Sequence, residues 1–214
     1  MKDKHATILI DLEPTEEEIM KNLQKDARWG IGRAQREGLI VEETNDNDDW
    51  SNFYRIFKRM AKEEGGAPPT LEELKCNTHI FFVCKKDTKI IAGAGISLGK
   101  IYCPTRQLQD IYSFEIPRLY FNASLPEYLK TQPNNLLYWN CILWCKSHNH
   151  KQFDLGGWQI KAKDPHLIGI NKFKEKWGEI TYFEREYPFF IALGRKLVRK
   201  SNLLFRLNKW RKKK

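Results

Sequence analysis

Residues 133–157 read PNNLLYWNCILWCKSHNHKQFDLGG and predict a helix followed closely by a strand. From Leu136 to about His148 the apolar side chains point to nearly every side of the helix: Leu137, Trp139, Cys141, Ile142, Trp144 and Cys145. A helix that is apolar all round is typical of the centre of a domain. Gln152–Leu155 predicts a strand that ends at Gly156-Gly157. The stretch therefore indicates a protein that mixes helices and strands.

The sequence outside this stretch extends the mixed pattern. Thr15 and Glu18 form a capping box, and an apolar stripe continues to about Glu37, which predicts one helix. The other predicted strands and helices are Ala6–Leu12, Leu39–Glu43, a helix with Trp50, Phe53, Phe57 and Met60, Thr70–Lys75, Thr78–Cys84, Lys89–Leu98, Arg118–Asn122, Leu167–Lys176 and Glu179–Phe183. Lys86–Thr88 supplies a hairpin turn, which favours a mixed, mostly antiparallel central sheet flanked by helices.

The net charge of +10 comes from one end of the chain. Ten of the 37 Lys and Arg lie in Arg195–Lys214, which has no Asp or Glu, so the remaining 27 balance all 27 acidic residues. We expect a domain over residues 1–187 and a basic amphipathic C-terminal helix over residues 188–214. Such a helix suits an anionic membrane surface or RNA phosphates, and equally a helix packed on the domain with a solvated end.

Composition excludes several classes of protein. With 41% hydrophobic residues the chain is not disordered, and no apolar run approaches the roughly 18 residues of a spanning helix. The N-terminus lacks the pattern of a signal peptide. The five cysteines are odd in number and lie mostly in apolar runs, which is typical of reduced thiols. We expect a cytoplasmic protein.

Common catalytic signatures are absent: the sequence has no P-loop, dinucleotide fingerprint, nucleophile elbow or zinc-protease helix. Cys141, Cys145, His148 and His150 form the nearest approach to a metal cluster, but their helix is apolar all round, and we expect no metal site. Asp154–Trp158 (DLGGW) lies at a strand end, where ligands often bind in mixed sheets; the alternative is a simple turn.

Five stretches occur in an order that resembles the Fem-type peptidoglycan aminoacyltransferases, whose domains have the GNAT fold. They are Lys21–Leu39 (KNLQKDARWGIGRAQREGL), Leu119–Ser124 (LYFNAS) with Pro133–Cys145, Phe153–Gly157 (FDLGG) and Lys172–Gly178 (KFKEKWG). The resemblance covers roughly residues 6–185 and implies a single GNAT-like domain. Fem enzymes contain two such domains in tandem, and this chain matches one of them, the second. A homodimer can replace the missing domain.

The resemblance implies an enzyme that transfers an acyl or aminoacyl group to an amine of a cell-wall precursor or a surface-glycan amino sugar. Phe173 and Lys174 match the family's Phe-Lys motif, which implies that they position the donor and stabilise negative charge. The donor is acyl-CoA or aminoacyl-tRNA as a co-substrate, and no bound cofactor is expected. The usual CoA pyrophosphate loop is not evident, because Ala92–Gly95 lies inside a predicted strand.

The remaining candidate site residues come from these motifs and from the chemistry of their side chains. We assign substrate binding to Asn122, Asp154, Gly156 and Gly157, and to Arg28 and Arg33, which can bind acceptor phosphates or be solvated helix charges. Candidate general bases are Asp110, Glu115 and Asp154. Partners implied are a lipid-linked precursor, tRNA and an anionic membrane at the inner face, contacted through Arg195–Lys214. The alternative is a non-catalytic RNA- or membrane-binding protein on a degenerate GNAT scaffold.

Overall fold

The computed structural model of the protein describes residues 2–99 and 116–186. In chain order its elements are β1 (Lys2–Asp11), α1 (Glu16–Asn22), α2 (Lys25–Arg36), β2 (Leu39–Glu43), α3 (Asn47–Glu63), α4 (Leu71–Cys76), β3 (Ile80–Lys86), β4 (Lys89–Ser97), β5 (Arg118–Ser124), the 3-10 helix η1 (Pro126–Thr131), α5 (Pro133–Ser147), β6 (Gln152–Trp158), α6 (Pro165–Lys174) and β7 (Glu179–Glu186). The described strands form a sheet in the order β2-β3-β4-β5-β6-β1-β7.

The chain divides into two compact units. The larger is Ala6–Thr181, and it contains all the site residues discussed below. Of the smaller unit the structure describes Lys2–His5 and Tyr182–Glu186. In the smaller unit the rings of His5 and Phe183 stack with their centroids 5.7 Å apart. The predicted basic helix at 188–214 lies outside the described residues.

The sheet is mostly antiparallel, which confirms the predicted fold class. β2, β3, β4 and β5 pair antiparallel in succession, and β6 pairs antiparallel with β1. β5 and β6 run parallel instead. The turn at Lys86–Thr88 joins β3 to β4 as the sequence predicts. Neighbouring parallel strands need a long crossover connection, usually a helix, and α5 lies in the connection between β5 and β6.

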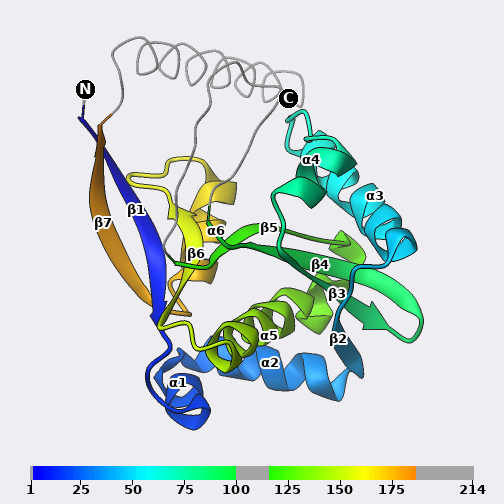
Figure 1. Ribbon diagram of the computed structural model, residues 1–214, viewed down its shortest axis with the longest axis horizontal. Coiled ribbons are helices and arrows are strands. Elements are labelled where there is room, and N and C mark those ends of the chain that lie inside the picture. The colour runs from blue at the N-terminus through cyan, green and yellow to red at the C-terminus, as the bar shows by residue number, and fades with distance from the viewer. Residues whose placement is uncertain (1, 100–115, 187–214) are drawn as a thin grey trace. The chain divides into compact units, whose positions relative to one another are not determined.

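Helices cover both faces of the central strands (Figure 1). On one face α3 packs its aromatic side chains against those of β3 and β5; the closest such pair is Trp50 and Phe81, with centroids 3.9 Å apart. On the other face lies α5, which is buried along its length as its composition predicts. α2 packs against α5, where Asn135 lies against Gly30.

The prediction of a single helix from Thr15 to Glu37 is wrong at its middle. Thr15 does cap a helix with Glu18 as predicted, but Leu23 and Gln24 are extended and separate α1 from α2. The Arg28 guanidinium donates to the carbonyl oxygens of Lys21 and Leu23, which completes the end of α1. The apolar stripe continues across the break, so periodicity alone does not reveal it.

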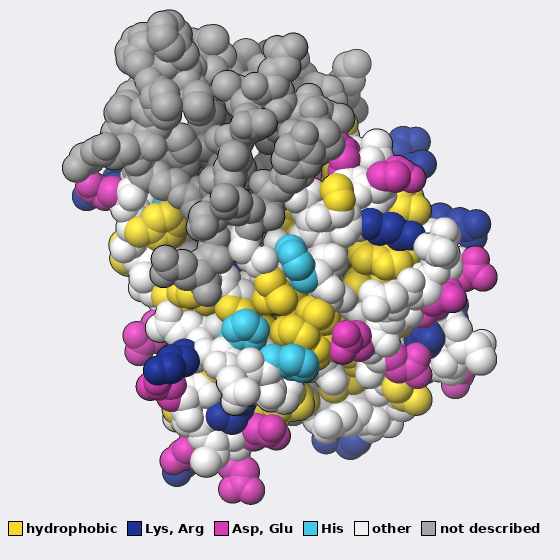
Figure 2. Space-filling view, in the orientation of Figure 1, with side chains coloured by type: hydrophobic (Ala, Val, Ile, Leu, Met, Phe, Trp, Pro, Cys, Tyr) yellow, Lys and Arg dark blue, Asp and Glu magenta, His cyan; other side chains and the backbone are white. Residues whose placement is uncertain are grey.

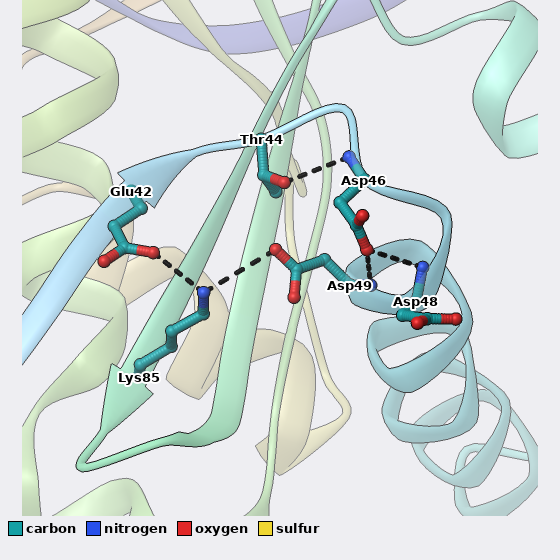
Figure 3. Close-up of polar contacts among 6 residues, drawn as sticks. All are labelled: Glu42, Thr44, Asp46, Asp48, Asp49 and Lys85. Atoms are coloured by element: carbon teal, nitrogen blue, oxygen red, sulfur yellow. Dashed lines mark hydrogen bonds and ion pairs between the residues drawn. The ribbon is translucent and has the colours of Figure 1, made fainter.

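The start of α3 is held by local polar contacts (Figure 3). Asp46 caps the helix by accepting hydrogen bonds from the backbone N–H groups of Asp48 and Asp49, at 2.7 and 3.0 Å. Lys85 of β3 lies between two carboxylates, 2.8 Å from Glu42 and 3.6 Å from Asp49. These pairs join β2, β3 and α3 at one corner of the larger unit.

The described surface carries both signs of charge. Figure 2 shows acidic and basic side chains mixed over the described part of one face. This agrees with the equal numbers of acidic and basic residues before Arg195. Among the described helices, none combines the length and the apolar character needed to cross a membrane.

Candidate functional site

β5 and β6 separate soon after they begin. Their parallel pairing has one register position, Arg118 opposite Asp154, and the Asp154 N–H donates to the Pro117 carbonyl oxygen at 2.9 Å. Beyond it β5 stays paired with β4 up to Ser124, and β6 stays paired with β1 as far as Trp158. Figure 1 shows the two strands running apart from this point. The site residues gather around this point of backbone separation, which is called the opening below.

Asp154 lies at the base of the opening and is 8% exposed. One carboxylate oxygen accepts hydrogen bonds from the Thr7 hydroxyl and from the Gly156 N–H, the latter at 2.7 Å. The other oxygen is 3.5 Å from Nε of Arg118. A buried carboxylate requires such partners. Asp154 therefore ties the starts of β5 and β6 to β1.

The two glycines after Asp154 form a bulge in β6. Two steps along β1, from Leu9 to Thr7, lie opposite three steps along β6, from Asp154 to Gly157. Gly156 has φ +77°, a left-handed conformation that favours glycine, whereas Gly157 has open space where a side chain would begin. The bulge redirects the carbonyl groups of this part of β6.

Lys174, the last residue of α6, binds those carbonyl groups. Its Nζ donates to the carbonyl oxygen of Leu155 at 2.8 Å and to that of Gly157 at 3.2 Å. The pKa of Lys174 is lowered from 10.5 to about 8, mainly because the side chain is buried and also because of the Arg118 charge, while the Asp154 charge opposes the shift. Most of the population is still charged at pH 7. The site thus presents a partly desolvated ammonium group at the opening.

Polar contacts between the loop after β6 and α6 fix the helix that carries Lys174. The Asn171 side chain accepts from the Gln159 N–H at 2.9 Å and donates to the Gln159 carbonyl oxygen at 2.8 Å. Nε1 of Trp158 donates to Glu175 at 2.7 Å. Because Asn171 is only 6% exposed, both bonds are shielded from water. Lys174 is therefore held in position by its own helix.

Tyr138 of α5 connects β5 with the Phe173-Lys174 pair. Its hydroxyl donates to Oδ1 of Asn122 at 3.1 Å, and its ring meets Phe173 edge-on with centroids 5.3 Å apart. Trp177 packs on the same ring, 5.5 Å away. Asn122, Phe173 and Lys174 are thus joined through one buried aromatic side chain.

The start of α5 does not offer a cradle for a pyrophosphate group. η1 occupies the segment before it, Pro133 has no N–H to donate, and the Gln132 N–H is bonded to the Leu129 carbonyl oxygen at 3.1 Å. The segment between Ser124 and Pro133 contains no glycine. A phosphate loop uses closely approaching backbone N–H groups, which glycines permit. Ala92–Gly95 lies inside β4, as predicted.

Arg28 and Arg33 are engaged on and beside α2 rather than with these residues. Arg28 binds the carbonyl oxygens at the end of α1. Arg33 pairs with Glu37 at 2.7 Å and lies over the Trp29 ring, 5.9 Å from its centroid. No described contact joins either guanidinium group to Asp154 or Lys174.

The cysteines are also placed as structural groups. Cys141 and Cys145 are fully buried, and burial raises the pKa of Cys145 to about 12, so its thiol keeps its proton at neutral pH. Within residues 2–99 and 116–186, no three His, Cys, Asp or Glu side chains are arranged to hold a metal ion.

The structure brings together most of the residues that the sequence assigns to the site: Asn122, Asp154, Gly156, Gly157, Phe173 and Lys174. Sequence reasoning did not select Thr7, Arg118 or Tyr138. Thr7 meets Asp154 across 147 positions of the chain, and no local pattern predicts such a contact. Asp110 and Glu115, two of the candidate bases, lie outside the described residues.

Comparison with solved structures identifies the fold. No family model matches the sequence, and no curated protein matches it. FemX superposes with a TM-score of 0.65 at 13% identity, over 84% of this chain and 61% of FemX. L-PGS from Bacillus licheniformis gives 0.61 at 13% identity, over 96% of this chain and 67% of L-PGS. A GCN5-related glucosamine N-acetyltransferase region of a fungal β-N-acetylglucosaminidase gives 0.51 at 8% identity, over 85% of this chain and 20% of that one.

The chain spans roughly three fifths of FemX, 61% of its length. At these identities the likeness establishes the fold alone. The order of the sequence motifs and the superposition agree: this chain has the FemX-like, GNAT-type fold.

Proposed function

We propose that the chain is an N-acyltransferase that binds the acyl end of its donor where β5 and β6 separate. The observation that carries this proposal is the Lys174 ammonium group held at that opening on the carbonyl groups of Leu155 and Gly157. A preorganised cation in a partly water-excluded place is suited to negative charge that develops during a reaction. The resemblance of Phe173-Lys174 to the Fem motif supports the same role.

In the proposed reaction an acceptor amine attacks the carbonyl carbon of the donor. A C–N bond forms, and the carbonyl oxygen becomes negatively charged in a tetrahedral intermediate. Lys174 stabilises that oxygen. The bond to the leaving oxygen or sulfur then breaks, and the proton lost by the amine passes to the leaving group. Asp154 is already bonded to Thr7, Gly156 and Arg118, so we assign it a positioning role rather than that of the base.

We propose aminoacyl-tRNA as the donor in preference to acyl-CoA. At the start of α5, Pro133 has no N–H group and the N–H groups of Gln132 and Asn135 are bonded to backbone carbonyl oxygens, so few N–H groups there could bind a CoA pyrophosphate. The superposition with FemX and the Fem-like order of motifs support the same choice. The aminoacyl group of a tRNA is an ester at its 3′ end, so its binding does not require a pyrophosphate-binding loop at the start of α5.

For the acceptor we propose an amine of a cell-envelope precursor, carried by a lipid at the cytoplasmic face of the membrane. One similar structure is the C-terminal domain of a putative lysylphosphatidylglycerol synthetase from Agrobacterium fabrum, with a TM-score of 0.58 at 14% identity, which supports an acceptor at a lipid surface. Arg28, Arg33 and Arg195–Lys214 are the proposed contacts with acceptor phosphates, anionic lipid or tRNA. A homodimer is the proposed substitute for a second domain.

The test supplies donors side by side. Purified protein is mixed with a pool of radiolabelled aminoacyl-tRNAs or with labelled acetyl-CoA, and with a lipid-linked precursor extract as acceptor. Label that passes from aminoacyl-tRNA into an amide-containing product supports the proposal. Label that passes only from acetyl-CoA overturns the donor assignment and leaves the N-acyltransferase.

A second arm separates an enzyme from a binding module. Protein truncated before Arg199 is assayed for transfer and for binding to anionic vesicles and RNA. Transfer by the full chain with binding lost on truncation indicates an enzyme with an anchor. Binding without transfer from either donor overturns the proposed function in favour of a non-catalytic scaffold.

A further inference from the structure

Asn122 has an unused pair of N–H groups at the opening between β5 and β6. It lies on β5 four residues beyond Arg118, the position at which the two strands pair. Its side-chain oxygen accepts from Tyr138. An amide with its oxygen occupied retains two N–H donors. No described residue accepts from this nitrogen, and the nitrogen is not among the buried polar atoms that lack a partner, so it is accessible.

Tyr138 determines which way the Asn122 amide faces. Its side chain is 2% exposed, and burial raises the pKa of its hydroxyl well above the usual value, so the hydroxyl keeps its proton. A buried hydroxyl needs a partner for that proton. The Asn122 oxygen is the partner, which leaves the amide nitrogen on the free side.

The same tyrosine reaches the other polar group of the site. Its ring contacts Phe173, which precedes Lys174 in the chain, and Trp177 packs on it from the following turn. The amide of Asn122 on β5 and the ammonium of Lys174, which α6 holds on the carbonyl groups of β6, are therefore two hydrogen-bond donors on the two sides of one opening, linked through Tyr138 and Phe173.

We propose that the Asn122 amide donates a hydrogen bond to the acyl oxygen of the donor, and that Tyr138 is a positioning residue that holds this amide in the donating orientation. The inference rests on the proposed acyl transfer. It specifies a second donor, from a side chain on β5, that complements Lys174 on the β6 side as the oxygen becomes negatively charged.

The first experiment measures transfer by three variants. Asn122→Ala removes the donor, and we expect kcat to fall by about 100-fold, as when one oxyanion donor is lost. Asn122→Asp places a carboxylate oxygen where the amide was, so we expect a larger loss than for alanine. Tyr138→Phe removes one hydroxyl and should reduce kcat by about 5–10-fold, the effect of one neutral hydrogen bond.

The matched control is Tyr54→Phe. Tyr54 of α3 also donates a hydrogen bond, to the Pro69 carbonyl oxygen at 3.0 Å, and the mutation removes the same atom. We expect wild-type kcat for this variant. Uncharged tRNA should bind all the variants equally, because it has no acyl oxygen, whereas a loss of folding would weaken its binding too.

A second measurement does not depend on turnover. An amide-linked aminoacyl-adenosine is added to ¹⁵N-labelled protein, and the side-chain NH₂ signal of Asn122 is identified by its loss in Asn122→Asp. We expect this signal to move with the aminoacyl compound and to stay in place with adenosine.

Any one of three results overturns the inference. The first is a kcat of Asn122→Asp equal to or above that of Asn122→Ala, and the second is an equal kcat for Tyr138→Phe and Tyr54→Phe. The third is an Asn122 NH₂ signal that does not move when the aminoacyl compound is added. Failure of the proposed function is a different result, since the wild-type protein would then transfer nothing from either donor.

Discussion

The two faces of β5 show how one short strand serves two purposes. Leu119, Phe121 and Ala123 lie on one face and are buried, and Phe121 packs in an aromatic cluster with Phe53 of α3. Arg118, Asn122 and Ser124 lie on the other face, are half-buried and bind polar partners: Asp154 of β6, and Tyr138 and Asn134 of α5. Adjacent residues of β5 therefore contribute alternately to the stability of the core and to the polar groups of the site. Burial of apolar area dominates on one face, while the other keeps hydrogen-bonding groups close to water.

The largest expected effect is on the aromatic face. Phe121 stacks on Phe53 with centroids 5.2 Å apart and also contacts Trp50, Phe57 and Phe81. We expect Phe121→Ala to lower the free energy of unfolding by about 3–5 kcal/mol. Urea denaturation measures it.

Ser124→Ala is the control on the opposite face of the same strand. It removes one hydrogen bond to Asn134, and we expect a loss of about 1 kcal/mol. Equal losses for Phe121→Ala and Ser124→Ala would contradict the division between the faces.

The next effect is on activity rather than stability. Lys174→Ala removes the charge at the opening, and we expect kcat to fall by about 10²–10³-fold with the fold intact. Initial rates measure the loss of kcat, and circular dichroism tests whether the fold is intact. Lys172→Ala, on the same helix, is the matched control with an exposed lysine. Normal turnover by Lys174→Ala would remove this residue from the mechanism.

A smaller effect is the pH dependence of stability that Lys174 produces. Its pKa is about 8 in the folded protein and near 10.5 when unfolded, so between these values the unfolded state binds more protons. Stability therefore rises with pH in this window. Relative to Lys174→Met, the wild-type protein should gain up to about 3 kcal/mol between pH 8 and pH 10.5.

Urea denaturation of both proteins across this range measures the difference, in which the titrations that they share cancel. Parallel stability curves for the wild-type protein and Lys174→Met would show that the ammonium group is not desolvated.

The smallest effect concerns the bulge in β6. Gly156→Ala forces a side chain into a left-handed conformation and should lower stability by about 1–2 kcal/mol. Gly157→Ala has open space and should change it little. Thermal denaturation compares the two variants, and equal melting temperatures for Gly156→Ala and Gly157→Ala would contradict the assigned bulge.

Sequence reasoning predicted elements whose cause is local. The apolar composition of α5 and the Thr15 capping box each lie within a few residues of chain, and both are confirmed. It failed at Leu23–Gln24, where Arg28 and the Lys176 carbonyl group, far along the chain, complete the break. The difference between local and long-range contacts also explains which site residues the sequence predicted. Asp154 and Lys174 belong to recognisable motifs, whereas Thr7 and Tyr138 matter only because the fold brings them to these motifs.

The double hydrogen bond between Asn171 and Gln159 has a consequence for protein engineering. It fastens the residue before a short segment, residues 160–163, to α6, and Asp164 at the end of that segment caps the helix. Sequences exchanged there should not disturb the helix that carries Lys174. Varying these four positions would test whether the placement of Lys174 depends on the hydrogen bonds between Asn171 and Gln159 alone and not on the residues between β6 and α6.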